Sequence, residues 1–461
     1  MLEEKVVDMI PLKEKLGLLN PEPSTCTIFM VPDELRSLKD NAYNPHSVSI
    51  GPYHYLNENL RDRNAHKLDY VLHLLHRAGD AVGTLDYCGK AIQTLGERVR
   101  ACYAEDIINR LKEELVEMLV VDGCFIIELF HRQVIKQDTS LYDPIADNGS
   151  MVSRLRHDLL LLGNQIPFFV IQKLYDIIKE QAAKAEQAEQ AEQAEQPQPQ
   201  QPRPRFNIPP EYSLTSLALS FFLPGKDVKQ GRIPPEPNHL LELLHKFWLL
   251  NSDQSRSGSG TLGFDLSASE LRKAGIRFKR NDRGHLLDIK FTGNDGVIEI
   301  PPLSIGELEL PLRNLIALEQ FDFSYSPSET YPVTSYALMM KTLIRSSGDT
   351  ELLRRKKIII SDSEGDEAVP NLIRDICQNV VFHENFYFHK LCVEVNEYRG
   401  SRCHWQKQKA IWSLRCHRYF AELKSDYFSS PWKVIAFLAG LVLLILTGLQ
   451  TFYTVRSYYP H

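Results

Sequence analysis

Three acidic residues stand in strongly apolar stretches and are the candidates for catalytic chemistry in this sequence. Asp122 and Glu128 lie within LVEMLVVDGCFIIELFHR, and Asp158 opens DLLLLGNQIPFFVIQKLYDII. Burial in apolar surroundings raises the pKa of a carboxyl group, and general acid or base catalysis near neutral pH uses such groups. Buried carboxylates also satisfy the amides of helix ends and loops, and this structural role is the alternative. A hydrolase-like enzyme would use Asp122, Glu128 or Asp158.

Metal and cofactor signatures are weak throughout the chain. His66, His73 and His76 share one predicted helix, but no cysteine or carboxylate completes a ligand set at a typical spacing. The cysteines form no CxxC pair, which favours reduced thiols. Residues 258–263 match GxGxxG formally, but they lack the preceding strand and following helix of a dinucleotide site. Neither a GxSxG elbow, an HExxH helix nor a P-loop is found, so we predict no enzymatic activity, no cofactor and no metal.

Two serines are candidate phosphorylation sites. Ser361 and Ser363 each precede an acidic residue by three positions in RRKKIIISDSEGDEAVP. A phosphate on either serine could pair with Arg354 and Arg355. An unmodified, solvated loop is the alternative.

The stretch 434–455, VIAFLAGLVLLILTGLQTFYTV, contains no charged residue. A helix needs about 20 apolar residues to cross the hydrocarbon core of a bilayer, so this stretch predicts a transmembrane helix rather than a buried core helix. The membrane anchor would comprise Trp432, Lys433, Gly440, Gln450 and Tyr453.

The charges that flank this stretch predict its orientation. Arg415, Arg418, Lys424 and Lys433 precede it, and only Arg456 follows. Basic residues favour the cytosolic side, and the N-terminus lacks the apolar run of a signal peptide. We therefore predict a tail-anchored, single-pass protein of the plasma membrane or an endomembrane, with a cytosolic body and the lipid bilayer as a partner.

Hydrophobic periodicity predicts a mainly α fold of the α+β class. Apolar residues cover nearly every face between Leu115 and Phe130, which is typical of a helix enclosed on all sides. IRFKR, LLDIKFT and VIEIPPL alternate in polarity around a turn at 293–296, which predicts a small antiparallel sheet at about 276–303. Ser269 is expected to cap the short helix before it.

Composition suggests the division of the chain. Residues 1–40 form an N-terminal segment, and 41–179 a helical first half. The low-complexity insert 180–206 (AEQ triplets, then PQPQQPRPR) carries no large apolar side chain and cannot pack. Residues 207–430 form a second half with the sheet and juxtamembrane helices, before the transmembrane helix and the tail 456–461. The net charge of −6 gives no general attraction for nucleic acid, so none is predicted as a partner.

Several stretches together resemble a plant-specific family, catalogued as domain of unknown function 247 (UPF 0481-like). They include VSIGPYHY, VDGCFIIELF, DLLLLGNQIPFFV, ELRKAGIRF, RNLIALEQF, VTSYALMMKTLI and PWKVIAFLAGLVLLILTGLQTFYTV. The resemblance spans about residues 28–455. One departure is Gly163, where the family usually has the Glu of Leu-Glu-Asn-Gln-Ile-Pro.

The resemblance implies a plant protein without established enzymatic activity. It also implies that some grass relatives take part in pollen self-incompatibility beside small secreted proteins. The sequence-based hypothesis is therefore a membrane-anchored recognition or signalling protein with an unknown protein or small secreted peptide as partner. The alternatives are the hydrolase-like enzyme and a structural membrane tether.

Overall fold

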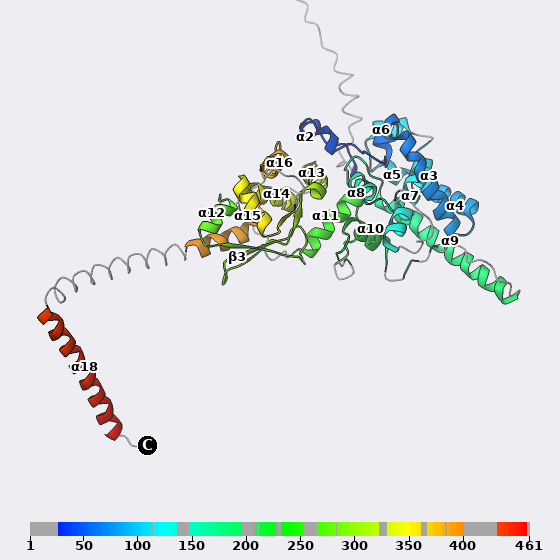
Figure 1. Ribbon diagram of the computed structural model, residues 1–461. Coiled ribbons are helices and arrows are strands. Elements are labelled where there is room, and N and C mark those ends of the chain that lie inside the picture. Colours follow the sequence, from blue (N-terminus) through cyan, green and yellow to red (C-terminus); the bar gives the residue numbers. More distant parts are fainter. Residues whose placement is uncertain are drawn as a thin grey trace, which may run out of the picture. The chain divides into compact units, whose positions relative to one another are not determined.

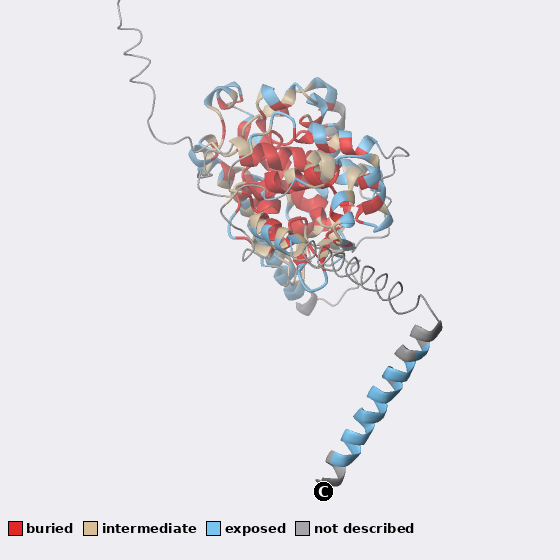
Figure 2. Cartoon of the chain, turned by 90° about the vertical axis from the view of Figure 1, so that its left-hand side faces the viewer, coloured by how far each residue is buried: buried red, intermediate tan, exposed pale blue. Residues whose placement is uncertain are grey.

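The fold is built around one long apolar helix, α7 (Leu115–Ile135), as its all-round apolar sequence predicts. Figure 1 shows the arrangement of the elements in the computed structural model. Helices α3 (Glu58–Arg77), α4 (Ala81–Thr94), α9 (Phe168–Glu195) and α10 (Leu214–Phe222) pack against α7. Its side chains from Met118 to Phe130 are mostly buried, and Figure 2 shows the buried residues gathered in the middle of the body.

The structure describes residues 26–458 except for these stretches: 112–113, 136–144, 146, 196–205, 207, 210–211, 227, 229–231, 253–259, 261–262, 264, 283, 322–329, 361–366, 383–384 and 401–430. The chain divides into two units, Met1–Glu394 and Val395–His461.

The remaining elements of the first unit are mostly helices, as expected. Short elements near its start are α2 (Asp33–Arg36), η1 (Asp40–Ala42), η2 (Pro52–His54), α5 (Gly96–Arg100), α6 (Glu105–Arg110) and α8 (Gly149–Asp158). Later helices are α11 (Leu240–Asn251), α12 (Ala268–Lys273), α13 (Ile305–Phe321), α14 (Pro332–Leu343), α15 (Ser347–Arg355) and α16 (Ala368–Ile376). Helix α10 packs on α11 and α8 packs on α13, which joins the earlier helices to the later ones.

The small sheet is mixed, which corrects the predicted antiparallel arrangement. Strands β2 (Lys290–Thr292) and β3 (Val297–Ile300) are antiparallel across the predicted turn. Strand β1 (Arg277–Arg280) pairs in parallel with the other edge of β3, with Phe278 opposite Ile298. The order β1-β3-β2 arises because residues 281–289 carry the chain past β3 before the hairpin begins. A second, two-stranded parallel sheet joins β4 (Leu303–Ser304) to β5 (Ile359–Ile360).

Side-chain caps define where several helices begin. Ser267, rather than the expected Ser269, caps α12, and it forms a capping box with Glu270. Ser346 and Asp349 form the same motif at α15. The Asp349 carboxylate also accepts the Ser269 amide at 2.8 Å, so it ties α12 to α15.

Helix α9 continues from a buried first half into the AEQ triplets. It begins at Phe168, after Pro167, and the Phe168 amide donates to the Asn238 carbonyl at 2.8 Å. Val170, Ile171 and Leu174 are buried, whereas the described side chains beyond Ala185 are mainly exposed. The insert thus begins as an extension of a packed helix.

The second unit contains helical residues 395–400 and α18 (Pro431–Tyr458). Across the described part of the chain, no helix is long and apolar enough to cross a membrane.

This finding contradicts the predicted transmembrane helix at 434–455. The bilayer as a partner and the single-pass membrane localisation were inferred from that helix, and they are wrong on the same ground. Among the predicted anchor residues, Gly440, Gln450 and Tyr453 lie exposed on α18. The side chains of Trp432 and Lys433 lie outside the described set.

Candidate functional site

Asp122 is placed by α7 against a short segment without helix or strand, residues 46–51, which we call the strap. Its Oδ2 accepts the Gly51 amide at 2.8 Å, and its Oδ1 lies 2.5 Å from the ammonium group of Lys67 on α3. Lys67 also donates to the Ser49 carbonyl. Burial raises the pKa of Asp122, while Lys67 and the Gly51 amide act in the opposite direction. The carboxylate and the cation together hold the end of the strap.

Asp158, the last residue of α8, holds the beginning of the same strap. Its two carboxylate oxygens accept the amides of His46, Ser47 and Val48 at 3.0, 2.6 and 2.9 Å. Burial raises the pKa of Asp158, and these three amides oppose the increase. The structure therefore brings Asp122 and Asp158 to one segment, where both are occupied by backbone donors.

Asn164 and Gln165 complete this buried polar network. Asn164 accepts the Ile50 amide at 2.7 Å and donates to the carbonyls of Val48 and Asp158. Gln165 donates to two carbonyls after α8 and accepts the Leu240 amide at 3.1 Å. The side chains of a single loop thereby form hydrogen bonds with backbone groups of the strap, of the end of α8 and of the start of α11.

Glu128 lies fewer than two helical turns beyond Asp122 on α7, in a separate cluster. Its Oε1 pairs with Arg132 at 2.7 Å and with Arg77 at 3.3 Å, and all of Glu128 is buried. Burial raises the pKa of Glu128, and both arginines oppose this effect. The structure does not bring Glu128 together with Asp122 and Asp158.

The structure contains a further buried carboxylate, Glu319, that the sequence analysis did not identify as a candidate. Glu319 of α13 accepts the amides of Val333 and Thr334 at the start of α14, at 2.9 and 2.7 Å. Its Oε1 also lies 2.7 Å from Nε2 of His245 on α11. The signal available in the sequence was an acidic residue inside the apolar run LIALEQF. Glu319 fixes the N-terminus of α14 against two neighbouring helices.

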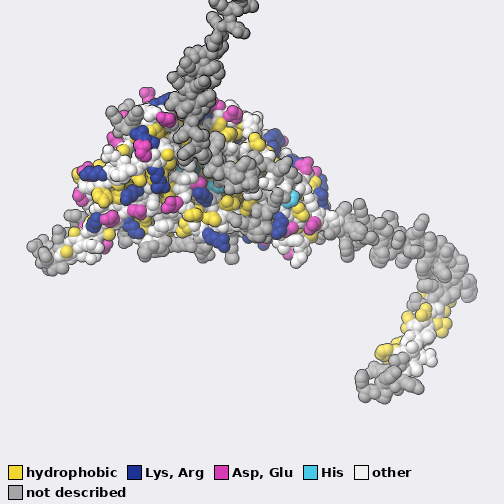
Figure 3. Space-filling view, turned by 180° about the vertical axis from the view of Figure 1, so that it is seen from behind, with side chains coloured by type: hydrophobic (Ala, Val, Ile, Leu, Met, Phe, Trp, Pro, Cys, Tyr) yellow, Lys and Arg dark blue, Asp and Glu magenta, His cyan; other side chains and the backbone are white. Residues whose placement is uncertain are grey.

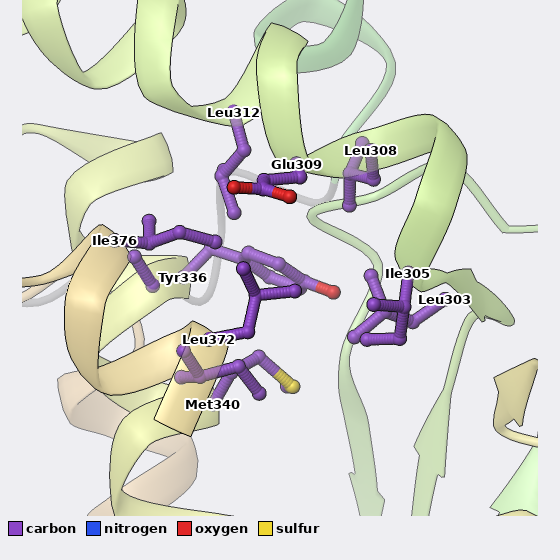
Figure 4. A pocket seen from close by; sticks show the side chains of 11 residues that line it. Leu303, Ile305, Leu308, Glu309, Leu312, Tyr336, Met340, Leu372 and Ile376 are labelled. Atoms are coloured by element: carbon purple, nitrogen blue, oxygen red, sulfur yellow. The ribbon is translucent and has the colours of Figure 1, made fainter. Parts of the chain in front are cut away.

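An apolar hollow opens beside α14, between α13 and α16. Leu308 and Leu312 of α13, Tyr336 and Met340 of α14, and Leu372 of α16 contribute to its lining. It encloses about 20 Å³, or about 360 Å³ when the space out to its mouth is included. Figure 4 shows the ring of Tyr336 extending into the hollow, with its hydroxyl toward Leu303 and Ile305.

Tyr336 is the buried polar group of this hollow. Only 1% of the residue is exposed. Burial alone raises the pKa of Tyr336, so the phenol remains protonated and can donate. Glu309, which also lines the hollow, pairs with Lys39 at 2.5 Å and with Arg313 at 3.2 Å.

The structure gives no support for a metal site among the described residues, and it does not test the two predicted phosphorylation sites. Within the described ranges, no group of three or more His, Cys, Asp or Glu side chains could hold a metal ion. Ser361 and Ser363 lie outside the described residues, so their phosphorylation stays a prediction. On the face shown in Figure 3, acidic and basic side chains are interspersed over the body.

Comparison with known proteins gives the family. Residues 28–446 match the model of a plant protein family of unknown function, domain of unknown function 247. This chain belongs to that family. It is also similar to UPF0481 protein At3g47200 of Arabidopsis thaliana, with 28% identity over 94% of this chain and 87% of that protein. Putative UPF0481 protein At3g02645 of the same plant is 23% identical over 95% and 91%. No solved structure matches.

Gly163, where the sequence resemblance led us to expect a glutamate, lies beside two side chains. A Cβ atom at this position would be 2.6 Å from Sδ of Met30 and 3.6 Å from Nε2 of His54. Burial lowers the pKa of His54 to about 4, with Arg36 contributing to the decrease. The space that a side chain at position 163 would enter is thus occupied by Met30.

Proposed function

We propose that this family member acts by binding another protein, and that the hollow between α13, α14 and α16 contacts the partner. The hollow is the observation that carries this proposal. Most of its lining residues are aliphatic, and Ile305, Leu308 and Leu372 are half-buried there. Half-buried apolar side chains around a concave surface are a common feature of protein interaction sites.

The placement of the carboxylates favours recognition over the hydrolase-like alternative. A general acid or base must come within hydrogen-bond reach of the reacting group. Asp122 and Asp158 instead bond to strap amides, and Glu128 bonds to two arginines. None of these three residues lines the hollow.

The partner to test first is the small secreted protein that the family resemblance implies. A role in signalling or in pollen self-incompatibility would require such a binding event and no reaction.

Proximity labelling in plant cells tests the proposal with the full chain. Leu308→Arg and Leu372→Arg place a cation at the edge of the hollow, where both side chains are half-buried. We expect a defined set of labelled proteins with the wild type, and loss of that set with either variant. Direct binding of the proteins lost from the set is then measured with purified components.

Val82→Arg and Leu68→Arg are the matched controls. Val82 is 78% exposed on α4 and Leu68 is 60% exposed on α3, so each change adds the same cation elsewhere. Both controls should retain the labelled set. Equal loss in controls and variants, or no loss in the folded variants, would contradict the proposed surface.

A further inference from the structure

A basic groove lies between α12 and α15, separate from the hollow. Arg272 and Lys273 of α12 and Glu351, Leu352 and Arg355 of α15 contribute to its lining, and none of them lines the hollow. Its volume of about 380 Å³ leaves room for about a dozen water molecules at about 30 Å³ each. The groove can therefore hold a ligand larger than a single ion.

The cations of this groove are only partly compensated. Arg272 and Lys273 are exposed in the last turn of α12, and neither makes an ion pair or a side-chain hydrogen bond with any residue that the structure describes. Arg355 pairs with Glu351, the acidic residue of the lining. Three cations against one carboxylate leave the groove with a net positive charge of two.

The two helices that carry these cations are tied to each other. Each begins with a capping box, and the Asp349 carboxylate of α15 accepts the Ser269 amide of α12 at 2.8 Å. Lys356 and Lys357, both exposed, continue the positive charge directly after α15. The backbone that presents the cations is thus in place before a ligand arrives, which lowers the ordering cost of binding.

A phosphate monoester matches the charge and the size of the groove. It carries a charge of about −1.5 to −2 at pH 7 and three acceptor oxygens, so one group can engage several cations at once. A phosphate ion alone would fill a small part of the groove. A phosphorylated side chain brings neighbouring residues, which can occupy the remaining space beside Leu352.

The charge of the whole chain favours a protein over a bilayer as the source of this phosphate. The chain has a net charge of −6, so its body repels an extended anionic surface. A single phosphate responds mainly to charges within the Debye length, about 10 Å at 0.1 M salt, and there the cations of the groove dominate.

We propose that the groove between α12 and α15 binds a phosphoserine or phosphothreonine segment of a partner protein, with Arg272, Lys273 and Arg355 contacting the phosphate. This site goes beyond the function proposed for the hollow and does not depend on it.

Phosphorus NMR of a phosphopeptide, titrated with the unphosphorylated full chain, tests the inference. The probe is the N-acetylated amide of Gly-Ala-phosphoserine-Leu-Gly, whose phosphorus signal reports contact at the phosphate itself. We expect saturable broadening of this signal. The same peptide with serine or aspartate in place of phosphoserine should compete poorly even at about tenfold excess, because neither carries two charges. Leu308→Arg, at the hollow, should leave the titration unchanged.

Charge-removing variants locate the site. Arg272→Gln/Lys273→Gln removes the two unpaired cations and keeps helix-favouring side chains, and the affinity should fall about fivefold to twentyfold. Lys90→Gln/Arg110→Gln is the matched control, because it removes two exposed cations from α4 and α6 and should leave the affinity constant.

Glu351→Gln provides a test that misfolding cannot imitate. The variant removes the carboxylate that competes with the ligand for Arg355. The affinity for the phosphopeptide should therefore rise about twofold to fivefold. An unchanged or lower affinity in the folded variant would contradict the placement of the phosphate beside Arg355.

Several other results would overturn the inference. They are an unbroadened phosphorus signal at the highest protein concentration, equal competition by the aspartate peptide, and equal affinities of Arg272→Gln/Lys273→Gln and its control. Inorganic phosphate that competes as well as the peptide would assign the groove to a free ion instead. Vesicles of phosphatidylcholine and phosphatidylinositol phosphate that compete more strongly than the peptide would assign it to a lipid headgroup.

Discussion

At the scale of single residues, the ion pair between Lys67 and Asp122 is the most consequential contact of the strap. Each side chain is at least 95% buried, and the pair also engages Gly51 and Ser49. A buried ion of this kind is tolerated only while its partner and its hydrogen bonds are present. The carboxylate that the sequence offered for catalysis therefore has a measurable structural role.

Asp122→Asn should lower the free energy of unfolding by about 3–5 kcal/mol, because it leaves the Lys67 cation buried without its counter-ion. Urea denaturation measures the change. The double variant Lys67→Met/Asp122→Asn removes the uncompensated cation and should recover part of the loss. A loss below about 1 kcal/mol in the single variant would show that this pair does not support the fold.

His54 should make the protein sensitive to mild acid. Its pKa in the folded state is about 4, against 6.5 in the unfolded chain, because burial and Arg36 disfavour the charged ring while Asp40 favours it. Between these values the unfolded chain binds more protons, so the contribution of His54 to stability is lost as the pH falls from about 6.5 toward 4. Above pH 6.5 both states are neutral and His54 contributes no pH dependence.

The variant His54→Leu isolates this effect. The difference in pH dependence between wild type and variant should reach about 3 kcal/mol between pH 6.5 and 4, measured by urea unfolding at several pH values. His66→Leu, which removes an exposed histidine from α3, is the control. Parallel pH profiles of wild type and His54→Leu would contradict the lowered pKa.

At the scale of elements, the strap depends on a close approach of two backbone segments at Gly51. Gly51 has φ of 75°, and a Cβ atom there would lie 2.2 Å from the Gln165 carbonyl oxygen. Neither the positive φ nor a collision with backbone can be relieved by a side-chain movement. This geometry explains why the turn contains glycine before Pro52.

Gly51→Ala should therefore destabilise the fold by at least about 2 kcal/mol in thermal or urea unfolding. Gly163→Ala is the matched control from the neighbouring loop. Its Cβ would meet the flexible Met30 side chain, so we expect a change within about 1 kcal/mol. Similar effects of both substitutions would show that the strap tolerates movement away from Gln165.

The AEQ part of α9 should be dispensable for stability. Deletion of residues 188–193 removes two triplets from the largely exposed end of the helix, and the free energy of unfolding should stay within about 0.5 kcal/mol. Leu174→Ala in the buried half of the same helix is the contrasting variant, with an expected loss of about 2–5 kcal/mol. Urea unfolding compares the two, and a large effect of the deletion would assign the insert a packing role.

At the scale of the whole molecule, α7 is the common neighbour of α3, α4, α9 and α10. Amides at the centre of such an element exchange with solvent only when the surrounding structure opens. Hydrogen exchange followed by mass spectrometry should therefore find the slowest peptides in α7 and much faster ones in residues 186–195. Exchange in α7 as fast as in that exposed end would contradict its central place.

Local patterns in the sequence were sufficient for several parts of the fold. The absence of a polar face between Leu115 and Phe130 predicted the enclosed helix α7, and alternating polarity predicted β2, β3 and their turn. The parallel pairing of β1 could not be predicted in this way, because alternation states which face is buried and not which strand lies alongside. The three-residue spacing of Ser267 and Glu270 is typical of a capping box, but the sequence analysis placed the helix cap two residues later, at Ser269.

For the candidate site, the sequence by itself determined which residues are carboxylates in apolar stretches and which family the chain resembles. It left open whether Asp122 and Asp158 serve catalysis or the fold, and it predicted a membrane-spanning helix that the described structure contradicts. Only the tertiary structure decided which donors face these carboxylates and that Tyr336 borders an apolar hollow. The physical reason is that periodicity reports contacts between near neighbours, whereas the strap amides meet Asp122 and Asp158 across large distances in sequence.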